Sequence, residues 1–196
     1  IAFGCTCIYI NSQTGGAQAI STFNQKFLNF VNGGFQITET FKIPYLICYF
    51  AIAAIVMWVV WNKTALGKNM FAIGGNKDAA AVSGVNITKN IMGVYIIAGV
   101  LYGIAAFLEA GRIQSVNTGT GLNYDLDAIS GCVIGGVSFS GGVGTIPGII
   151  IGVVILQFIN YSLNFLSVNP YLQYIIKGAI IILAVAIDVR KYIAKK

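Results

Sequence analysis

Long runs of apolar residues constrain the fold of this chain more than any other feature of its sequence. Four runs, over residues 43–61, 91–110, 143–166 and 171–187, come near the roughly 20 residues that a helix needs to cross a bilayer core of about 30 Å. Charged residues make up 9% of the chain and hydrophobic ones 57%, which leaves too few charges to cover a soluble domain of this size. The sequence therefore predicts an all-α, polytopic transmembrane helix bundle.

Basic residues predict the orientation of this bundle. Eight of the twelve Lys and Arg residues lie in two short segments, 62–90 and 188–196. Cytoplasmic loops are rich in Lys and Arg, so both segments are expected inside and 11–42 and 111–124 outside. Residues 1–10 are already apolar and no Met precedes them. We expect them to end a helix that begins earlier, so that residues 1–196 form a single transmembrane domain that is the C-terminal part of a longer chain.

Parity of crossings predicts one further, short span. A chain that is inside at both residue 90 and residue 190 crosses an even number of times, whereas only three long runs follow residue 90. The remaining candidate is 127–140, which is short for a span and is followed by the glycine-rich break 141–144. Broken or re-entrant spans occur where protein or a watery cavity surrounds them, and in transporters they often line the pathway. A short helix shielded by its neighbours is the alternative.

Polar residues within or beside the spans are the candidates for a translocation path. Lys177 is about two turns into the last run, where a charge is costly unless it is paired or reaches the surface. Pairing with Asp127 or Glu109, snorkelling, and direct contact with substrate all remain open for it. The other candidates either bond between helices or face a polar solute; they are Asp127, Ser130, Ser138, Ser140, Asn160 and Asn164.

Three pairs of glycines spaced four apart predict close helix packing. These pairs are Gly99 and Gly103, Gly131 and Gly135, and Gly148 and Gly152.

The loop 62–90 is long for a connector, and its centre predicts a short helix over 76–85. Asn76 is a suitable N-cap, Asp78 suits the first turn, and Gly84 can end the helix. A helix of small residues facing the cytoplasm could dock into a groove of a partner protein; a capped connector is the alternative.

The residue types argue against an enzyme. The chain contains no His, and its glycine-rich stretches lack the Lys-Ser/Thr ending of a phosphate-binding loop. Its four cysteines lie in apolar stretches and are expected to be buried thiols. We expect no metal site, no cofactor and no ATP hydrolysis by this chain, and the positive charge of the inside loops leaves no need for a nucleic-acid partner.

Several longer strings of residues resemble one known family. They are GKNMFAIGGNKDAAAVSGV (67–85), LEAGRI (108–113), YDLDAISGCVIGGVSFSGGVGT (124–145) and VNPYLQYIIKGAIIILAVA (168–186). Together they resemble the permease subunits of bacterial ABC sugar importers, over roughly residue 58 to the end. Galactose or methylgalactoside is the cargo that the resemblance implies, with ribose, another pentose, a branched-chain amino acid or a signalling molecule as alternatives. A stand-alone carrier is a further alternative.

The resemblance also implies partners and a place in the cell. A second copy of the permease would complete the path, an ATP-binding subunit would dock below, and a sugar-binding protein would deliver cargo from outside. The protein would lie among lipid in the bacterial cytoplasmic (inner) membrane. By resemblance, 62–90 is the coupling loop that touches the ATPase, and the match places this role on Asn76, Asp78, Ala79, Ala80 and Gly84.

Overall fold

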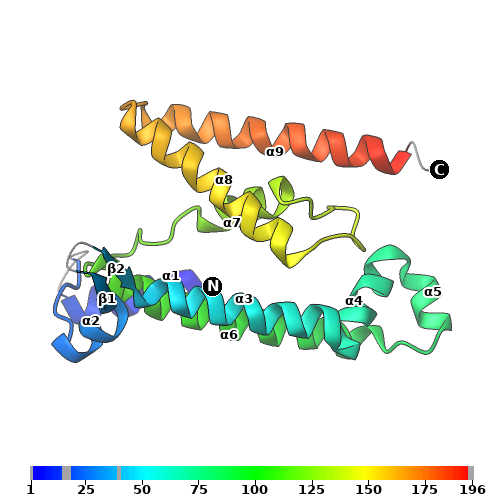
Figure 1. Ribbon diagram of the computed structural model, residues 1–196, viewed down its shortest axis with the longest axis horizontal. Coiled ribbons are helices and arrows are strands. Elements are labelled where there is room, and N and C mark those ends of the chain that lie inside the picture. Colours follow the sequence, from blue (N-terminus) through cyan, green and yellow to red (C-terminus); the bar gives the residue numbers. More distant parts are fainter. Residues whose placement is uncertain (1, 15–18, 39–40, 194–196) are drawn as a thin grey trace. The chain divides into compact units, whose positions relative to one another are not determined.

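The computed structural model describes residues 2–14, 19–38 and 41–193 (Figure 1). Helices dominate, and a two-stranded hairpin is the exception. In chain order the elements are α1 Ala2–Thr14, α2 Gln25–Asn32, β1 Gly34–Thr38, β2 Phe41–Pro44, α3 Tyr45–Lys63, α4 Ala65–Gly75, α5 Lys77–Val82, α6 Ile87–Ile113, α7 Tyr124–Ile134, α8 Ile146–Phe165 and α9 Pro170–Ile193.

The four long apolar runs form helices, as the sequence predicts. Within the described residues three helices, α3, α6 and α8, are long and apolar enough to cross a membrane, and α9 contains a shorter apolar stretch, Pro170–Leu183. Many large apolar side chains are exposed, including Phe158 at 74% and Ile175 at 70%. Such surfaces suit lipid or another subunit and would be unusual on a soluble monomer.

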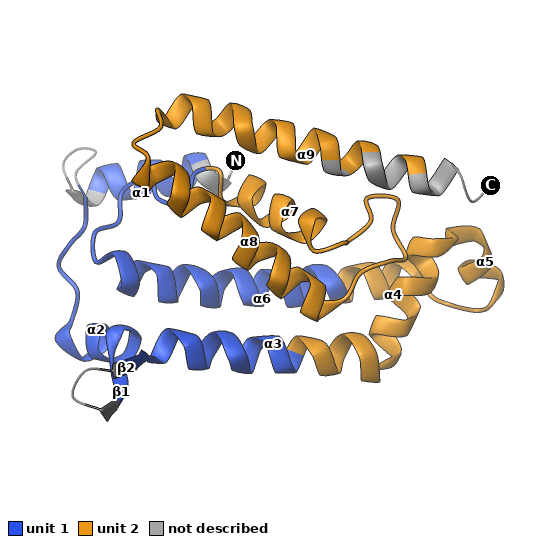
Figure 2. Ribbon diagram, turned by 45° about the horizontal axis from the view of Figure 1, so that its top comes forward, with its two compact units in different colours: residues 1–56, 94–122 blue, residues 57–93, 123–196 orange. Residues whose placement is uncertain are grey.

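The chain divides into two compact units, residues 1–56 with 94–122 and residues 57–93 with 123–196 (Figure 2). In the first unit α2 packs on the final turns of α6. Val31 is fully buried and lies against Gly111, where a β-carbon would come within 2.6 Å of its methyl group. The Asn32 side-chain amide donates to the Gly111 carbonyl at 2.7 Å, and the ring centroids of Phe27 and Phe107 lie 4.7 Å apart.

A β-hairpin in the expected outer segment was not predicted. β1 and β2 pair antiparallel with Phe35 opposite Ile43, and the register shifts after Gln36. The hairpin leads directly into α3. Pro44 consequently closes β2 and directly precedes α3. The absent N–H of proline suits both the end of a strand and the residue before a helix.

In the second unit, glycines bring α7 and α8 into backbone contact. A β-carbon on Gly135 would collide with the carbonyl of Gly148, and one on Gly152 with the carbonyl of Gly131. The predicted pair Gly131 and Gly135 therefore packs against the predicted pair Gly148 and Gly152. The third pair, Gly99 and Gly103, has no described atom within 4 Å of either β-carbon position.

The predicted short element differs from its expected bounds. The helix α7 begins at Tyr124 and ends at Ile134, so that residues 135–140 of the predicted element 127–140 are not helical. Gly136 has a left-handed backbone with φ of 83°, which stops the helix. An eleven-residue helix is roughly 16 Å long, about half of a bilayer core.

Candidate functional site

An ion pair joins α7 to α9 in the second unit. The Lys177 ammonium lies 2.7 Å from Asp127 Oδ1, and the two side chains are only 16% and 23% exposed. Asp127 lies in the first turn of α7, where a carboxylate complements the helix dipole. Of the two partners considered for Lys177, Asp127 is confirmed. Glu109 instead forms a two-pronged pair with Arg112, both contacts being 2.7 Å.

Two side-chain carboxamides form further polar contacts at the corner between α8 and α9. Gln173 Nε2 donates to Asn164 Oδ1 at 3.0 Å and to the Val168 carbonyl at 3.0 Å. Asn160 lies one helical turn before Asn164 on α8, and Lys177 lies one turn after Gln173 on α9. Because residues four apart share a helix face, Asn160 lies on the face of Asn164, and Lys177 lies on the face of Gln173.

Asn160 has a buried oxygen that no described residue satisfies. The residue is 9% exposed, and Oδ1 has no hydrogen-bond partner among the residues that the structure describes. A buried carbonyl without a donor is costly, and most such groups in proteins are paired. Asn160 Oδ1 is therefore a buried acceptor whose hydrogen-bonding capacity the described residues leave unused. We define Asp127, Asn160, Asn164, Gln173 and Lys177 as the polar cluster.

The predicted serines do not join the polar cluster. Ser130 is 1% exposed, and its hydroxyl donates to the Leu126 carbonyl at 2.6 Å within α7. Ser138 and Ser140 lie beyond the C-terminal end of α7, whereas Asp127 lies near its N-terminal end. The Ser140 N–H donates to Ser138 Oγ at 3.1 Å, which shapes the turn there.

The helix predicted at the centre of the loop 62–90 is confirmed. Asn76 ends α4 and caps α5, and its side-chain oxygen accepts from the Ala79 N–H at 3.0 Å. Asp78 lies in the first turn of α5. Gly84 follows with φ of 82°, and the Val85 N–H bonds to the Ala80 carbonyl at 3.1 Å, so the glycine closes the helix as predicted.

The candidate coupling residues do not all face outward. Ala80 is 4% exposed and packs inside its own unit, whereas Asn76, Asp78, Ala79 and Gly84 are exposed. Sequence reasoning overlooked Val82, which is 91% exposed. Residues 79 and 82 are three apart and share a face of the helix. A larger apolar residue at that spacing, next to the run of alanines, was the available signal.

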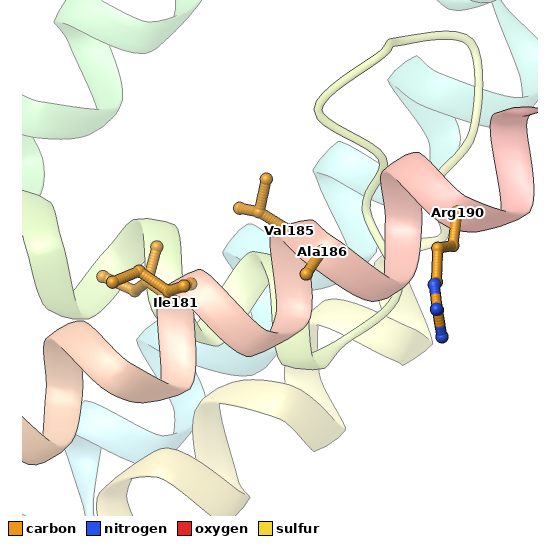
Figure 3. Close-up of a pocket in the computed structure, with 5 residues that line it drawn as sticks. Ile181, Val185, Ala186 and Arg190 are labelled. Atoms are coloured by element: carbon orange, nitrogen blue, oxygen red, sulfur yellow. The ribbon is translucent and has the colours of Figure 1, made fainter.

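A wide concavity along α9 has a different character. It is a shallow, open hollow of about 560 Å³, lined by Ile181, Ile182, Val185, Ala186 and Arg190 (Figure 3). Four of these five side chains are apolar and offer no hydrogen bonds, so the concavity suits acyl chains and not a polyhydroxylated solute.

Comparisons with known proteins agree with this architecture. The family described as branched-chain amino acid transport system / permease component matches residues 1–185. The chain is 52% identical to the Galactose/methyl galactoside import permease protein MglC of Haemophilus influenzae and 51% identical to that of Escherichia coli; each alignment covers all 196 residues and 57% of the relative. It is 36% identical to the Ribose import permease protein RbsC of Escherichia coli over 96% of this chain and 57% of the relative. No solved structure matches.

The chain thus spans somewhat more than half the length of the curated relatives that it matches. Almost the whole chain fits the family, and three described helices can each cross a bilayer. The chain is a multi-pass inner-membrane protein, and it belongs to the family described as branched-chain amino acid transport system / permease component.

Proposed function

We propose that this chain forms the C-terminal part of the permease of an ATP-driven importer that moves galactose or methylgalactoside into the cytoplasm. The observation that carries the proposal is the 52% identity, over all 196 residues, to a relative named as a galactose and methyl galactoside import permease. Identity to a ribose permease is 36%, so a hexose is favoured over a pentose. The family description names branched-chain amino acids, which makes them the second candidate cargo.

ATP hydrolysis is assigned to a partner chain that docks on the loop 62–90. On α5 the exposed Asp78, Ala79 and Val82 form the proposed contact surface. Ala79 and Val82 present small and apolar surface, and Asp78 adds a charge at the edge that would orient the partner. Ala80 supports this surface from inside the unit, where its small side chain lets α5 pack closely.

The other partners are assigned by the same resemblance. A sugar-binding protein is proposed to deliver cargo on the side opposite to α5, and a second copy of the permease is proposed to complete the path. In that dimer α7 is proposed to lie nearer the two-fold axis than α3. Its buried Ser130 and its ion pair with α9 support this assignment, because both keep α7 within protein.

Within the proposed path Asn160 is the residue best suited to contact a sugar. A sugar hydroxyl donates hydrogen bonds, and Asn160 Oδ1 is a buried acceptor that lacks a donor among the described residues. Asp127 and Lys177 neutralise each other, and Asn164 accepts from Gln173, so these residues position the site. Ser130, Ser138 and Ser140 are bonded to nearby backbone or to each other and are assigned the same supporting role.

Uptake by whole cells tests the proposed cargo. The complete gene that contains this sequence, with the genes of its ATP-binding and sugar-binding partners, is expressed in bacteria that lack their own galactose permease. We expect uptake of radiolabelled galactose that excess methylgalactoside abolishes and that excess ribose or leucine leaves largely unchanged. Uptake of leucine without galactose would assign the second candidate cargo instead.

Docking of the partner is tested with Val82→Asp. A buried charge in an apolar contact is strongly unfavourable, so this change should prevent co-purification of the ATP-binding subunit. Ser83→Asp, at a neighbouring exposed position of the same turn, is the matched control. Equal co-purification of both variants would exclude the proposed surface.

A further inference from the structure

The loop that follows α7 meets the end of α4 at glycines on both sides. A β-carbon placed on Gly74 would lie 2.5 Å from the backbone nitrogen of Gly142, and one on Gly141 would lie 2.6 Å from the Gly74 carbonyl oxygen. A β-carbon on Gly142 would lie 2.8 Å from the nitrogen of Gly75. Both views of the chain show this loop reaching α4 (Figures 1 and 2). We call Gly74, Gly141 and Gly142 the glycine joint.

Two of these three positions also require glycine for conformational reasons. Gly141 and Gly142 have φ of 90° and 70°, a backbone region that residues with a β-carbon rarely adopt. The turn is braced from within, because the Ser138 N–H bonds to the Val143 carbonyl and the Gly141 N–H to the Ser138 carbonyl. The loop therefore presents a shaped backbone surface to α4.

The glycine joint lies between the two candidate sites. On one side α4 ends at Asn76, which is also the cap of α5, and α4 and α5 pack together. On the other side the loop connects the end of α7 to Thr145, the N-cap of α8. α7 packs on α8 and on α9, and its first turn carries the ion pair to Lys177. All of these segments belong to the second unit.

Backbone contact transmits displacement better than contact through long side chains. A side chain can change rotamer and absorb a shift, whereas peptide groups in direct contact cannot. Packed interfaces of this kind switch between discrete arrangements and do not deform continuously.

We infer that the glycine joint couples movement of α5 to the polar cluster, with Gly74, Gly141 and Gly142 acting as positioning residues for transport. When the ATP-binding partner displaces α5, α4 pushes the loop after α7, and α7 and α8 carry the displacement to Asp127 and Asn160. The inference rests on the proposed function, since it requires an ATPase docked on α5. It adds the route within this chain by which that docking acts on the path.

Neighbouring glycines supply matched controls for the test. Gly75 directly follows Gly74, yet a β-carbon on Gly75 meets nothing within 4 Å. Gly136 has φ of 83°, similar to Gly141, and also opens on free space. Gly75→Ala thus controls for alanine at the end of α4, and Gly136→Ala controls for backbone strain without contact.

The experiment uses the complete importer in proteoliposomes, and measures galactose uptake and ATP hydrolysis together. We expect Gly74→Ala and Gly141→Ala to retain the ATP-binding subunit but to lower galactose taken up per ATP hydrolysed by roughly tenfold. Gly75→Ala and Gly136→Ala should stay within about twofold of wild type. Equal ratios for Gly74→Ala and Gly75→Ala would overturn the inference. Absence of galactose uptake by wild type would instead reject the proposed function.

A measurement on the unaltered protein covers the case in which Gly74→Ala does not fold. Hydrogen exchange is followed in the complex with and without a non-hydrolysable ATP analogue. Peptides over 70–76 and 138–144 should change protection together. A change over 70–76 alone would show that α4 moves without the loop, and the glycine joint would then carry no coupling.

Discussion

Removing either charge of the Asp127–Lys177 pair should destabilise the protein more than removing both. At 2.7 Å two unit charges attract by about 6 kcal/mol at an effective dielectric constant of 20. Much of this attraction offsets the cost of withdrawing the charges from water. The single variants Asp127→Asn and Lys177→Met each leave one charge without its counter-charge. Since both side chains are mostly buried, we expect each to cost about 2 kcal/mol.

The double variant tests whether these costs belong to the pair. With both charges absent no uncompensated charge remains, and we expect a loss of only about 1 kcal/mol. The sum of the single effects then exceeds the double effect by about 3 kcal/mol, which is the coupling energy. The readout is the apparent melting temperature of the fluorescently tagged permease in one detergent, followed by size-exclusion chromatography. Each single variant should lower it by about 5 °C.

The Glu109–Arg112 pair supplies a control with the same distance and greater exposure. Its shortest contact is also 2.7 Å, but the Arg112 side chain is 53% exposed. Exposed pairs contribute little, so Arg112→Met should cost at most about 0.5 kcal/mol. The reasoning is refuted if the double variant loses as much as the two single variants together, or if Lys177→Met is no worse than Arg112→Met.

Three further predictions concern the path, the packing and the orientation. Asn160→Leu should leave the melting temperature unchanged or raise it, because it removes an unsatisfied buried oxygen, yet lower galactose uptake roughly tenfold; equal uptake would remove Asn160 from the path. Gly152→Ala should destabilise by about 1–3 kcal/mol because its β-carbon meets a carbonyl of α7, whereas Gly103→Ala, with open space around it, should be neutral in the same melting assay. In a cysteine-free background, a membrane-impermeant thiol reagent applied from outside should label a cysteine at the exposed Asn117 and not at the exposed Lys77; labelling at Lys77 would reverse the assigned orientation.

The long helices could be predicted because a bilayer leaves the chain few alternatives. Every backbone polar group in lipid must be satisfied within the segment, so a long apolar run becomes a helix whatever its neighbours are. Helix α3 begins at Tyr45 and α8 at Ile146, each within three residues of the expected start. The capped helix α5 was predictable for a local reason, since Asn76 and Gly84 make their bonds within ten residues of each other.

What sequence reasoning missed depends on contacts between distant segments. The β1–β2 hairpin has short strands with only a few alternating residues, and nothing local marks their pairing. The inward position of Ala80 depends on how α5 packs, and the role of Gly74 depends on a loop more than sixty residues later in the sequence. Only the structure could show that Lys177 pairs with Asp127 and not with Glu109, since both acids lie near ends of helices.

The ion pair also has a consequence for the order in which the chain is made. Helix α9 is a poor candidate for insertion into lipid by itself, since Lys177 lies within its apolar run 171–187. A lysine at the centre of a helix adds about 2.5–3.5 kcal/mol to the free energy of insertion from the translocon. Synthesis proceeds from the N-terminus, so Asp127 leaves the ribosome fifty residues earlier than Lys177. When α9 emerges, its counter-charge is already available, and a segment that would insert poorly alone enters the membrane as the partner of α7.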